Sequence, residues 1–341
     1  MNYSELAAAA RGNIGPFCKA CPVCDGRACG SLMPGPGAKG RGRVAVRNYD
    51  AWDAFPLAMD PVHASFEAST RTKVLGHDLA LPVLIGPVGD VNRHYGEKYT
   101  TVEYNSSIMR AAQASGTFAF TGDGLDPAIM TESLRAIETL GGAGIPTIKP
   151  WAMGIVQEKL EAAKRVKPVA IAMDVDAAGL PFLKHQDPPA GFKDVSQLRE
   201  IADQCHDAGI PFILKGIMSP LVAEKAVDAG ADAIIVSNHG GRVLDGVPSS
   251  AEVLLEVSSD VAGDVEVLVD GGVRSGVDVF RALALGAGAV LMARPFVVAV
   301  YGGGEQGARD YLAQLADELA DTMEMCGAET VADIDEDMLS W

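Results

Sequence analysis

The sequence contains no uninterrupted apolar run of the roughly 18–20 residues that a membrane-spanning helix requires. The apolar run at 7–10 is too short for a signal peptide, and Arg11 ends it. We therefore expect a protein without a membrane span, located in the cytoplasm.

Positive charge is also scarce. The chain has 28 Lys and Arg against 45 Asp and Glu, a formal net charge of −17. Such a surface repels polyanions, so we expect no nucleic-acid partner. Residues 1–50 differ, because there seven basic residues outnumber three acidic ones. With 48% hydrophobic residues, the rest of the chain can bury a substantial core. We predict an N-terminal region at 1–50, with a helix, a Cys-rich cluster and a Gly-rich linker, and a folded domain at 51–341.

Cysteine is rare outside one short segment. Four of the six cysteines, Cys18, Cys21, Cys24 and Cys29, have the spacing C-x2-C-x2-C-x4-C. In a reducing compartment this cluster indicates metal or redox chemistry before structural disulfides. Its spacing is close to that of ferredoxin-like [4Fe–4S] sites, a structural Zn²⁺ is the second hypothesis, and metal-free thiols are the third. The Gly-rich stretch 35–42 is predicted to be a flexible linker, whose basic residues could also approach an anion.

From residue 81 onward, short apolar runs alternate with segments of helical periodicity. The eight runs are 81–87, 117–121, 145–149, 169–174, 211–215, 233–237, 265–270 and 289–292. Eight apolar strands, each followed by a helix, predict a (β/α)8 TIM barrel. A doubly wound open sheet is the alternative.

Polar and Gly-rich residues follow most of these strands, and in a barrel all eight carboxyl ends meet at one face. Asp270, Gly271, Gly272 and Arg274 follow the seventh strand, and Ala293 and Arg294 follow the eighth. Glycines allow close backbone approach to an anion, and arginines supply bidentate donors. Gly271 and Gly272 could simply form a tight turn, but with two arginines nearby we predict a phosphate-bearing cofactor.

After the sixth strand, His239 and Arg242 lie three residues apart on a Gly-rich loop. An arginine can hold a carboxylate while a histidine takes a proton from the neighbouring carbon or its hydroxyl. This pairing is suited to an acid substrate, although a lone loop histidine is more often simply solvated.

Five segments in the second half of the chain are distinctive. They are Ile-Leu-Lys-Gly-Ile at 213–217, Val-Ser-Asn-His-Gly-Gly-Arg at 236–242, Leu-Asp-Gly-Val-Pro at 244–248, Asp-Gly-Gly-Val-Arg at 270–274 and Ala-Leu-Ala-Leu-Gly-Ala at 282–287. Together they resemble the FMN-dependent 2-hydroxy acid oxidase and dehydrogenase family, which includes glycolate oxidase, lactate oxidase and the flavin domain of flavocytochrome b2. The resemblance is dense over 194–333 and thinner over 44–174.

The resemblance implies specific roles. His239 would be the base, Asp174 the carboxylate that orients it, Arg242 the anchor of the substrate carboxylate and Lys215 the cation beside the reduced flavin. Trp151 would stand at a substrate-contacting position. The FMN-binding set would comprise Pro87, Val88, Gly89, Gly122, Lys149, Lys215, Ser237, Asp270, Gly271, Gly272, Arg274, Ala293 and Arg294.

The sequence also departs from the family. Lys149 and Trp151 stand where members usually have a glutamine and a tyrosine, a second tyrosine is missing near the N-terminus, and no second substrate arginine follows the fourth strand. Only 41 positions separate Asp174 from Lys215, so the lid region is short. These departures leave room for a larger substrate, or for docking of an electron-accepting protein.

The leading hypothesis is an FMN enzyme that oxidises a small-molecule 2-hydroxy acid, with the cysteine cluster as a possible electron port. The alternatives are an FMN-dependent isomerase, similar to type 2 isopentenyl diphosphate isomerase, and a non-catalytic flavin or metal carrier. By resemblance we expect a homo-oligomer, specifically a tetramer. The other histidines, at 63, 77, 94, 185 and 206, are predicted to be surface or packing residues.

Overall fold

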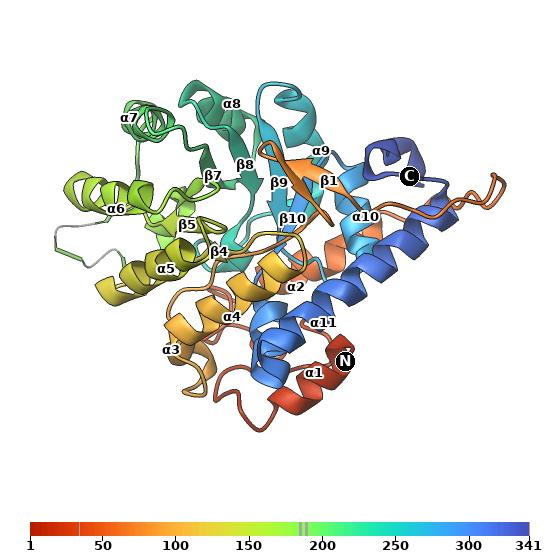
Figure 1. Cartoon of the computed structure of the whole chain (residues 1–341), viewed down its shortest axis with the longest axis horizontal. Coiled ribbons are helices and arrows are strands. Elements are labelled where there is room, and N and C mark those ends of the chain that lie inside the picture. Colours follow the sequence, from red (N-terminus) through yellow and green to blue (C-terminus); the bar gives the residue numbers. More distant parts are fainter. Residues whose placement is uncertain (34, 184–185, 188–189, 341) are drawn as a thin grey trace.

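The computed structural model describes residues 1–33, 35–183, 186–187 and 190–340. Eight parallel strands form its centre, in the order β3-β10-β9-β8-β7-β6-β5-β4 (Figure 1). They are β3 (Val83–Ile85), β4 (Phe120–Thr121), β5 (Ile145–Ile148), β6 (Ile171–Asp174), β7 (Phe212–Ile217), β8 (Ala233–Val236), β9 (Glu266–Asp270) and β10 (Ala289–Met292). Each coincides with one of the eight predicted strands.

The two ends of this sheet meet. Ile85 of β3 forms a parallel bridge with Ala119, just before β4. The backbone N–H of Ile85 donates to the carbonyl of Phe118 at 3.1 Å. The sheet therefore closes into a barrel, which confirms the TIM-barrel prediction. The doubly wound alternative is wrong, because such a sheet would leave β3 or β4 with an unpaired edge.

Helices surround the barrel (Figure 1). They are α3 (Val91–Tyr95), α4 (Thr101–Ala114), α5 (Pro127–Thr139), α6 (Met153–Arg165), α7 (Val195–His206), α8 (Pro220–Asp228), α9 (Ser250–Asp260), α10 (Gly276–Ala284) and α11 (Arg294–Cys326). Several begin with a capping box, as at Ser249 and Glu252. Helix α11 starts at Arg294, shortly after β10, and bends where Gly304 adopts non-helical angles.

Side chains fill the barrel interior. Alternate residues of each strand point inward, so Leu84, Ile235 and Leu268 pack in one cluster, while their neighbours face the helices. The hairpin of β1 (Thr72–Val74) and β2 (His77–Leu79) packs against the same cluster through Val74 and Leu79. The barrel is therefore a packed core, and only its rim is free to form a site.

The N-terminal region is folded against the barrel. Helix α1 (Tyr3–Ala10) lies beside α11 (Figure 1). Leu6 is fully buried there, and a side-chain carbon at Gly302 would collide with the Leu6 backbone. Helix α2 (Arg43–Asp50) follows, and the described residues between the two helices, 11–33 and 35–42, are irregular. The N-terminal region therefore packs on the last helix of the barrel.

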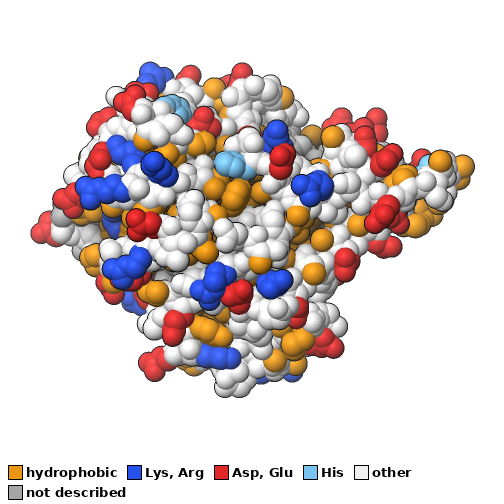
Figure 2. All heavy atoms as spheres, viewed as in Figure 1, with side chains coloured by type: hydrophobic (Ala, Val, Ile, Leu, Met, Phe, Trp, Pro, Cys, Tyr) orange, Lys and Arg blue, Asp and Glu red, His pale blue; other side chains and the backbone are white. Residues whose placement is uncertain are grey.

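Residues 57–70 project from the body beside the end of α11, and Figure 2 shows apolar side chains on this projection. Met59 and Val62 are exposed, while the N–H of Ala58 donates to the carbonyl of Met338. Among the described helices, none combines the length and apolar character needed to cross a bilayer.

Candidate active site

A cavity of about 350 Å³ opens at the carboxyl ends of the strands. Its size falls within the range of small-molecule pockets, roughly 300–1,000 Å³. Thirteen of the predicted site residues line it: Pro87, Val88, Gly89, Lys149, Lys215, His239, Arg242, Asp270, Gly271, Gly272, Arg274, Ala293 and Arg294. Parallel strands bring them together, although they span more than 200 positions of sequence.

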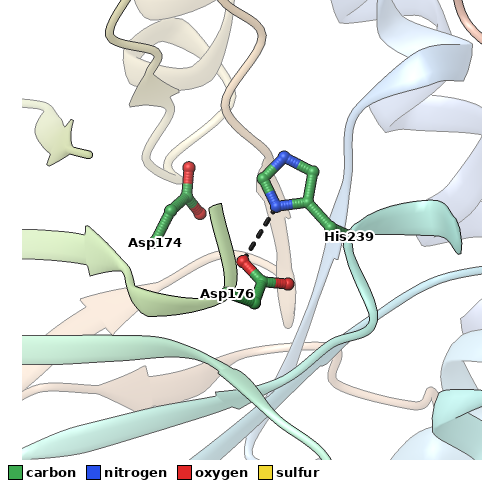
Figure 3. A group of neighbouring side chains, drawn as sticks. All are labelled: Asp174, Asp176 and His239. Carbon is green, nitrogen blue, oxygen red and sulfur yellow. Dashed lines mark hydrogen bonds and ion pairs between the residues drawn. The ribbon is translucent and has the colours of Figure 1, made fainter. Parts of the chain in front are cut away.

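The histidine on the cavity wall pairs with a carboxylate that the resemblance did not assign to it. His239 Nδ1 lies 2.9 Å from Oδ1 of Asp176 (Figure 3). Asp174, which was expected to orient His239, makes no hydrogen bond to it and forms ion pairs with Lys149 and Lys215 instead. In the described structure, the carboxylate that contacts His239 is therefore Asp176.

The turn that follows β6 explains this correction. Asp174 is the last residue of β6, and its carboxylate pairs with Lys149 and Lys215. Asp176 lies on the 3-10 turn at Val175–Gly179 that follows, where its carboxylate reaches His239 Nδ1.

Two lysines and two aspartates form a charge network at the wall of the cavity. Lys215 Nζ lies 3.4 Å from both Asp174 and Asp270, and Lys149 Nζ lies 3.5 Å from Asp174. Burial acts to raise the pKa of Asp174, but Lys215, His239 and Lys149 outweigh it, so this pKa lies below its ordinary value. Burial acts to lower the pKa of Lys215, and the carboxylates of Asp270 and Asp174 outweigh that effect. Lys215 is therefore a permanent cation on the cavity wall.

The loop that carries His239 is held in an uncommon conformation. His239 has a φ of +57°, a value unusual for a residue with a side chain. Its backbone N–H donates to Ser237 Oγ, which also accepts from Lys215 Nζ at 3.0 Å. Gly240 follows with a φ of +62°, and a Cβ there would collide with the guanidinium of Arg294. The close packing explains why glycine stands at this position.

A pair of side-chain amides fixes this loop to the N-terminal region. Asn48 on α2 donates to Asn238 Oδ1 at 2.8 Å, and Asn238 Nδ2 donates back to Asn48 Oδ1 at 2.7 Å. Both residues are buried. Asn238 Oδ1 also accepts from the N–H of Gly241. The pairing between α2 and the loop gave no local signal in the sequence, because 190 positions separate the two asparagines.

Three guanidiniums line the cavity without an acidic partner. Arg242 Nη1 donates to the carbonyls of Gly35 and Gly37, at 2.6 and 2.8 Å. Arg294 Nη1 donates to the carbonyl of Pro36, and Arg274 Nε donates to that of Cys24. In the described part of the chain, none of the three forms an ion pair with a carboxylate. Their positive charge is therefore available to a bound anion.

The Gly-rich stretch is not a free linker. Besides the bonds from Arg242 and Arg294, the backbone N–H of Lys39 donates to the carbonyl of Gly241. Lys39 Nζ donates to the carbonyls of Gly179 and Val243. The prediction of a solvated linker is wrong here, because the described residues 35–39 pack across the mouth of the cavity through backbone hydrogen bonds.

Four of the residues predicted to bind FMN or substrate or to act in catalysis lie outside the cavity wall. Asp174 and Ser237 both contact Lys215, which lines the cavity: Asp174 forms an ion pair with it, and Ser237 Oγ accepts a hydrogen bond from it. Gly122 packs so closely on Val88 and Gly89 that a Cβ would strike their backbone. Trp151, expected to touch substrate, is buried, and its indole N–H donates to Asp123 at 2.5 Å. Trp151 thus lies outside the cavity wall of the described chain, and its contact with substrate stays a prediction.

Sequence reasoning missed further cavity residues on α3. Arg93, His94 and Tyr95 line the cavity, and His94 Nδ1 accepts a hydrogen bond from the N–H of Gly35 at 2.9 Å. His94 had been predicted to be a surface or packing residue. The available signal was its position in the loop after the first strand, since polar residues after barrel strands face the site. His185, in the same prediction, lies outside the described residues.

The four clustered cysteines are free and partly buried. Burial raises the pKa of Cys18 to about 12. A tetrahedral Zn²⁺ with Zn–S bonds of about 2.3 Å needs sulfurs about 3.8 Å apart. Within the described ranges, which include all four cysteines, no three of their Sγ atoms lie within 4.8 Å of one another. The thiols are therefore not arranged as a closed zinc site.

Comparisons with known proteins agree with this geometry. The model of the family described as FMN-dependent dehydrogenase matches residues 36–193 and 182–341. A 141-residue segment, 41% of this chain and 38% of the relative, is 50% identical to the L-lactate oxidase of Roseobacter sp. (strain GAI101). A 143-residue segment is 48% identical to the 4-hydroxymandelate oxidase of Amycolatopsis orientalis, covering 42% of this chain and 38% of that enzyme. The matched segments thus span well under half of these curated relatives.

The fold is similar over a much larger share of the chain. A solved structure of mandelate oxidase superposes with a TM-score of 0.81 at 27% identity, and it covers 99% of this chain and 97% of that one. A second structure, of the same enzyme with benzoyl-formic acid, gives a TM-score of 0.81 at 26% identity, with the same coverage. The similarity includes the N-terminal region.

Proposed function

The chain belongs to the FMN-dependent dehydrogenase family, and we propose that it binds FMN and oxidises a 2-hydroxy acid to the corresponding 2-oxo acid. The observation that carries the proposal is the juxtaposition, in one cavity, of His239 backed by Asp176 and of Arg242 without an acidic partner. A base and a carboxylate anchor are the two groups that such a substrate requires.

The charges of the cavity fit FMN and an acid substrate together. Arg242, Arg274 and Arg294 contribute three positive charges that no carboxylate of the described chain neutralises. A phosphate monoester carries about −1.5 to −2 at neutral pH, and a carboxylate adds one more. Arg274 and Arg294, with the backbone of Gly271 and Gly272, would hold the phosphate. Pro87, Val88 and Gly89 would flank the flavin ring.

Each remaining residue has a definite task. Arg242 would bind the substrate carboxylate, and His239 would take the proton that the substrate loses at its reacting carbon or hydroxyl. Asp176 would hold the imidazole in position and stabilise its charged form. Bound FMN supplies the two-electron acceptor. Lys215, kept cationic by its carboxylate neighbours, would stabilise negative charge that accumulates on the acceptor.

The test is the absorption spectrum of the purified protein, followed by anaerobic addition of L-lactate or mandelate. These acids are chosen because the relatives and structural neighbours are lactate and mandelate enzymes. The expected result is a flavin spectrum that bleaches on addition of one of the acids. Absence of flavin after reconstitution with FMN, or a flavin that no 2-hydroxy acid reduces, would overturn the proposal.

The cysteine cluster carries a finer proposal, that it holds a [4Fe–4S] cluster. Each thiolate of such a cluster binds a different iron, so the sulfurs stand farther apart than around one Zn²⁺. In the described arm no three Sγ atoms are close enough for one Zn²⁺, a spacing that is equally compatible with metal-free thiols. Arg274 lines the cavity and donates to the carbonyl of Cys24, so the arm adjoins the flavin site. About four irons per chain in anaerobically purified protein is the expected result, and stoichiometric zinc or no metal contradicts it.

The two alternative functions have less support. An isomerase or a carrier would not need a histidine backed by a carboxylate beside an arginine, as at His239, Asp176 and Arg242. Loss of flavin reduction in His239→Ala would exclude a carrier, which needs no base. An electron-accepting protein partner, a homotetramer and a cytoplasmic location stay predictions.

A further inference from the structure

Helix α3 supplies polar groups to the end of the cavity that contains Arg242. Relatives usually bind substrate with two tyrosines and a second arginine, none of which has a counterpart in this sequence. Arg93, His94 and Tyr95 enter the same cavity from a different element, the helix after β3. Helix α3 therefore brings polar side chains to a cavity that lacks the usual tyrosines and second arginine.

The Tyr95 hydroxyl is free to bind. Tyr95 lines the cavity and is only 4% exposed. In the described part of the chain its hydroxyl has no hydrogen-bond partner, yet it is not among the atoms sealed from solvent, whereas Tyr3 and Tyr104 have sealed hydroxyls. The hydroxyl therefore opens to the cavity. Burial raises the pKa of Tyr95, while Arg294 and Arg242 oppose the rise, so the hydroxyl is a neutral donor near both guanidiniums.

His94 offers a second donor of fixed direction. Its Nδ1 accepts from the N–H of Gly35 at 2.9 Å, which requires that nitrogen to be unprotonated. Burial, together with the charges of Arg242, Arg93 and Lys149, lowers the pKa of His94 to about 4. The ring is therefore neutral, and its single proton lies on Nε2. Among the described residues Nε2 has no partner, and like the Tyr95 hydroxyl it is not sealed.

We propose that the Tyr95 hydroxyl and the His94 Nε2–H bind the carboxylate of the substrate together with Arg242, so that α3 replaces the tyrosines and the arginine that the sequence lacks. The inference rests on the proposed function and names the subsite within it. Arg242 Nη1 is already committed to Gly35 and Gly37, which leaves Nε and Nη2 for a carboxylate. Because a carboxylate has about four acceptor sites, the donors of α3 can bind it alongside Arg242. Neutral donors add hydrogen bonds without adding another buried charge.

Tyr95→Phe is an informative variant because it removes a hydroxyl that has no partner in the protein. If Tyr95 had only a structural role, Tyr95→Phe would leave the affinity for a 2-oxo acid unchanged. The variant keeps the aromatic ring and its contact with Tyr301, at 6.5 Å between centroids. Tyr99→Phe is the matched control, because Tyr99 also packs on Tyr301 but lies outside the cavity wall. Two variants test His94. His94→Gln keeps one hydrogen-bond acceptor and one donor in the side chain, whereas His94→Leu removes both.

The experiment titrates FMN-loaded protein with benzoylformate, a 2-oxo acid, and follows the flavin absorbance. We expect Tyr95→Phe to raise Kd about tenfold or more, as for loss of a hydrogen bond to a charged group. FMN content and Tm should match those of Tyr99→Phe. His94→Leu should weaken binding similarly, and His94→Gln should restore most of it.

Two contrary results are distinguishable. Wild-type protein that binds benzoylformate while Tyr95→Phe binds it within twofold overturns the role of α3 and leaves the proposed function intact. Wild-type flavin that neither responds to benzoylformate nor is reduced by lactate or mandelate overturns the proposed function, and this inference with it.

Discussion

Asp176, and not Asp174, is the carboxylate that contacts His239, with 2.9 Å between Oδ1 and Nδ1. The two aspartates are two positions apart, but they serve different neighbours. Asp174 pairs with Lys149 and Lys215, whereas Asp176 pairs with His239. Their substitutions should therefore have different consequences.

Asp176→Asn should slow flavin reduction by about 10² to 10⁴, because the imidazole loses the carboxylate that stabilises its charged form. Its FMN content and unfolding free energy should change little. Asp174→Asn should instead lower the unfolding free energy by about 3–5 kcal/mol, since it leaves buried lysine charge without its partner. Stopped-flow reduction and urea unfolding measure the two effects. Equal slowing by both variants would contradict the assignment.

His239→Ala should retain FMN and lose flavin reduction by about 10² to 10⁴, the contribution typical of a general base. Rapid-mixing measurement of flavin bleaching by the substrate is the readout. His206→Ala is the control, because His206 pairs with Asp232 on the surface. A loss of less than tenfold in His239→Ala argues against its role as base.

Arg274→Ala should weaken FMN retention by on the order of 10- to 100-fold, since a charge-assisted hydrogen bond contributes about 1.5–3 kcal/mol. Flavin released on dialysis, measured by fluorescence, gives the occupancy. Arg135→Ala, on an exposed stretch of α5, serves as the control. Unchanged occupancy in Arg274→Ala would remove this residue from the phosphate site.

Asn48→Ala should lower the unfolding free energy by about 1–3 kcal/mol, because the buried amide of Asn238 loses its reciprocal partner. It should also slow flavin reduction, since Asn238 supports the loop that carries His239. Asn105→Ala removes another buried amide, one that donates to Ser133 away from the cavity. That control should lose stability and keep its reduction rate, and equal rates in both variants would contradict the role of the pair.

Stability should fall in acid partly through His94. Its folded pKa of about 4 lies below the ordinary value of 6.5, so the unfolded chain binds more protons between these values. The contribution of His94 is complete above about pH 6.5 and declines as pH falls toward 4, by up to about 3 kcal/mol. Urea unfolding across this range should give a flatter profile for His94→Gln than for wild type. Parallel profiles would show that His94 is not held neutral in the folded state.

Much of the architecture was predictable because it depends on local pattern. Each of the eight apolar runs became a strand, since a strand of a parallel barrel is buried on both faces and reads as continuous hydrophobic sequence. The convergence of His239, Lys215 and Arg294 followed from the fold itself, because every parallel strand ends on the same rim. The parallel order of the strands and the closure of the barrel therefore determined the position of most site residues.

Contacts between distant segments could not be read in the same way. Whether Asp174 or Asp176 contacts His239 depends on the 3-10 turn after β6, which the apolar periodicity of the sequence does not predict. Arg242 donates to the backbone carbonyls of Gly35 and Gly37, more than 200 positions away in the sequence. Because every residue type has a backbone carbonyl, the sequence gives no signal for these hydrogen bonds. The sequence by itself thus determined the barrel, its rim and the chemical types gathered there. Only the tertiary structure decided the pairing of His239 with Asp176 and the exposure of His94 and Tyr95 to the cavity, because hydrogen bonds between remote groups depend on ångström-scale placement.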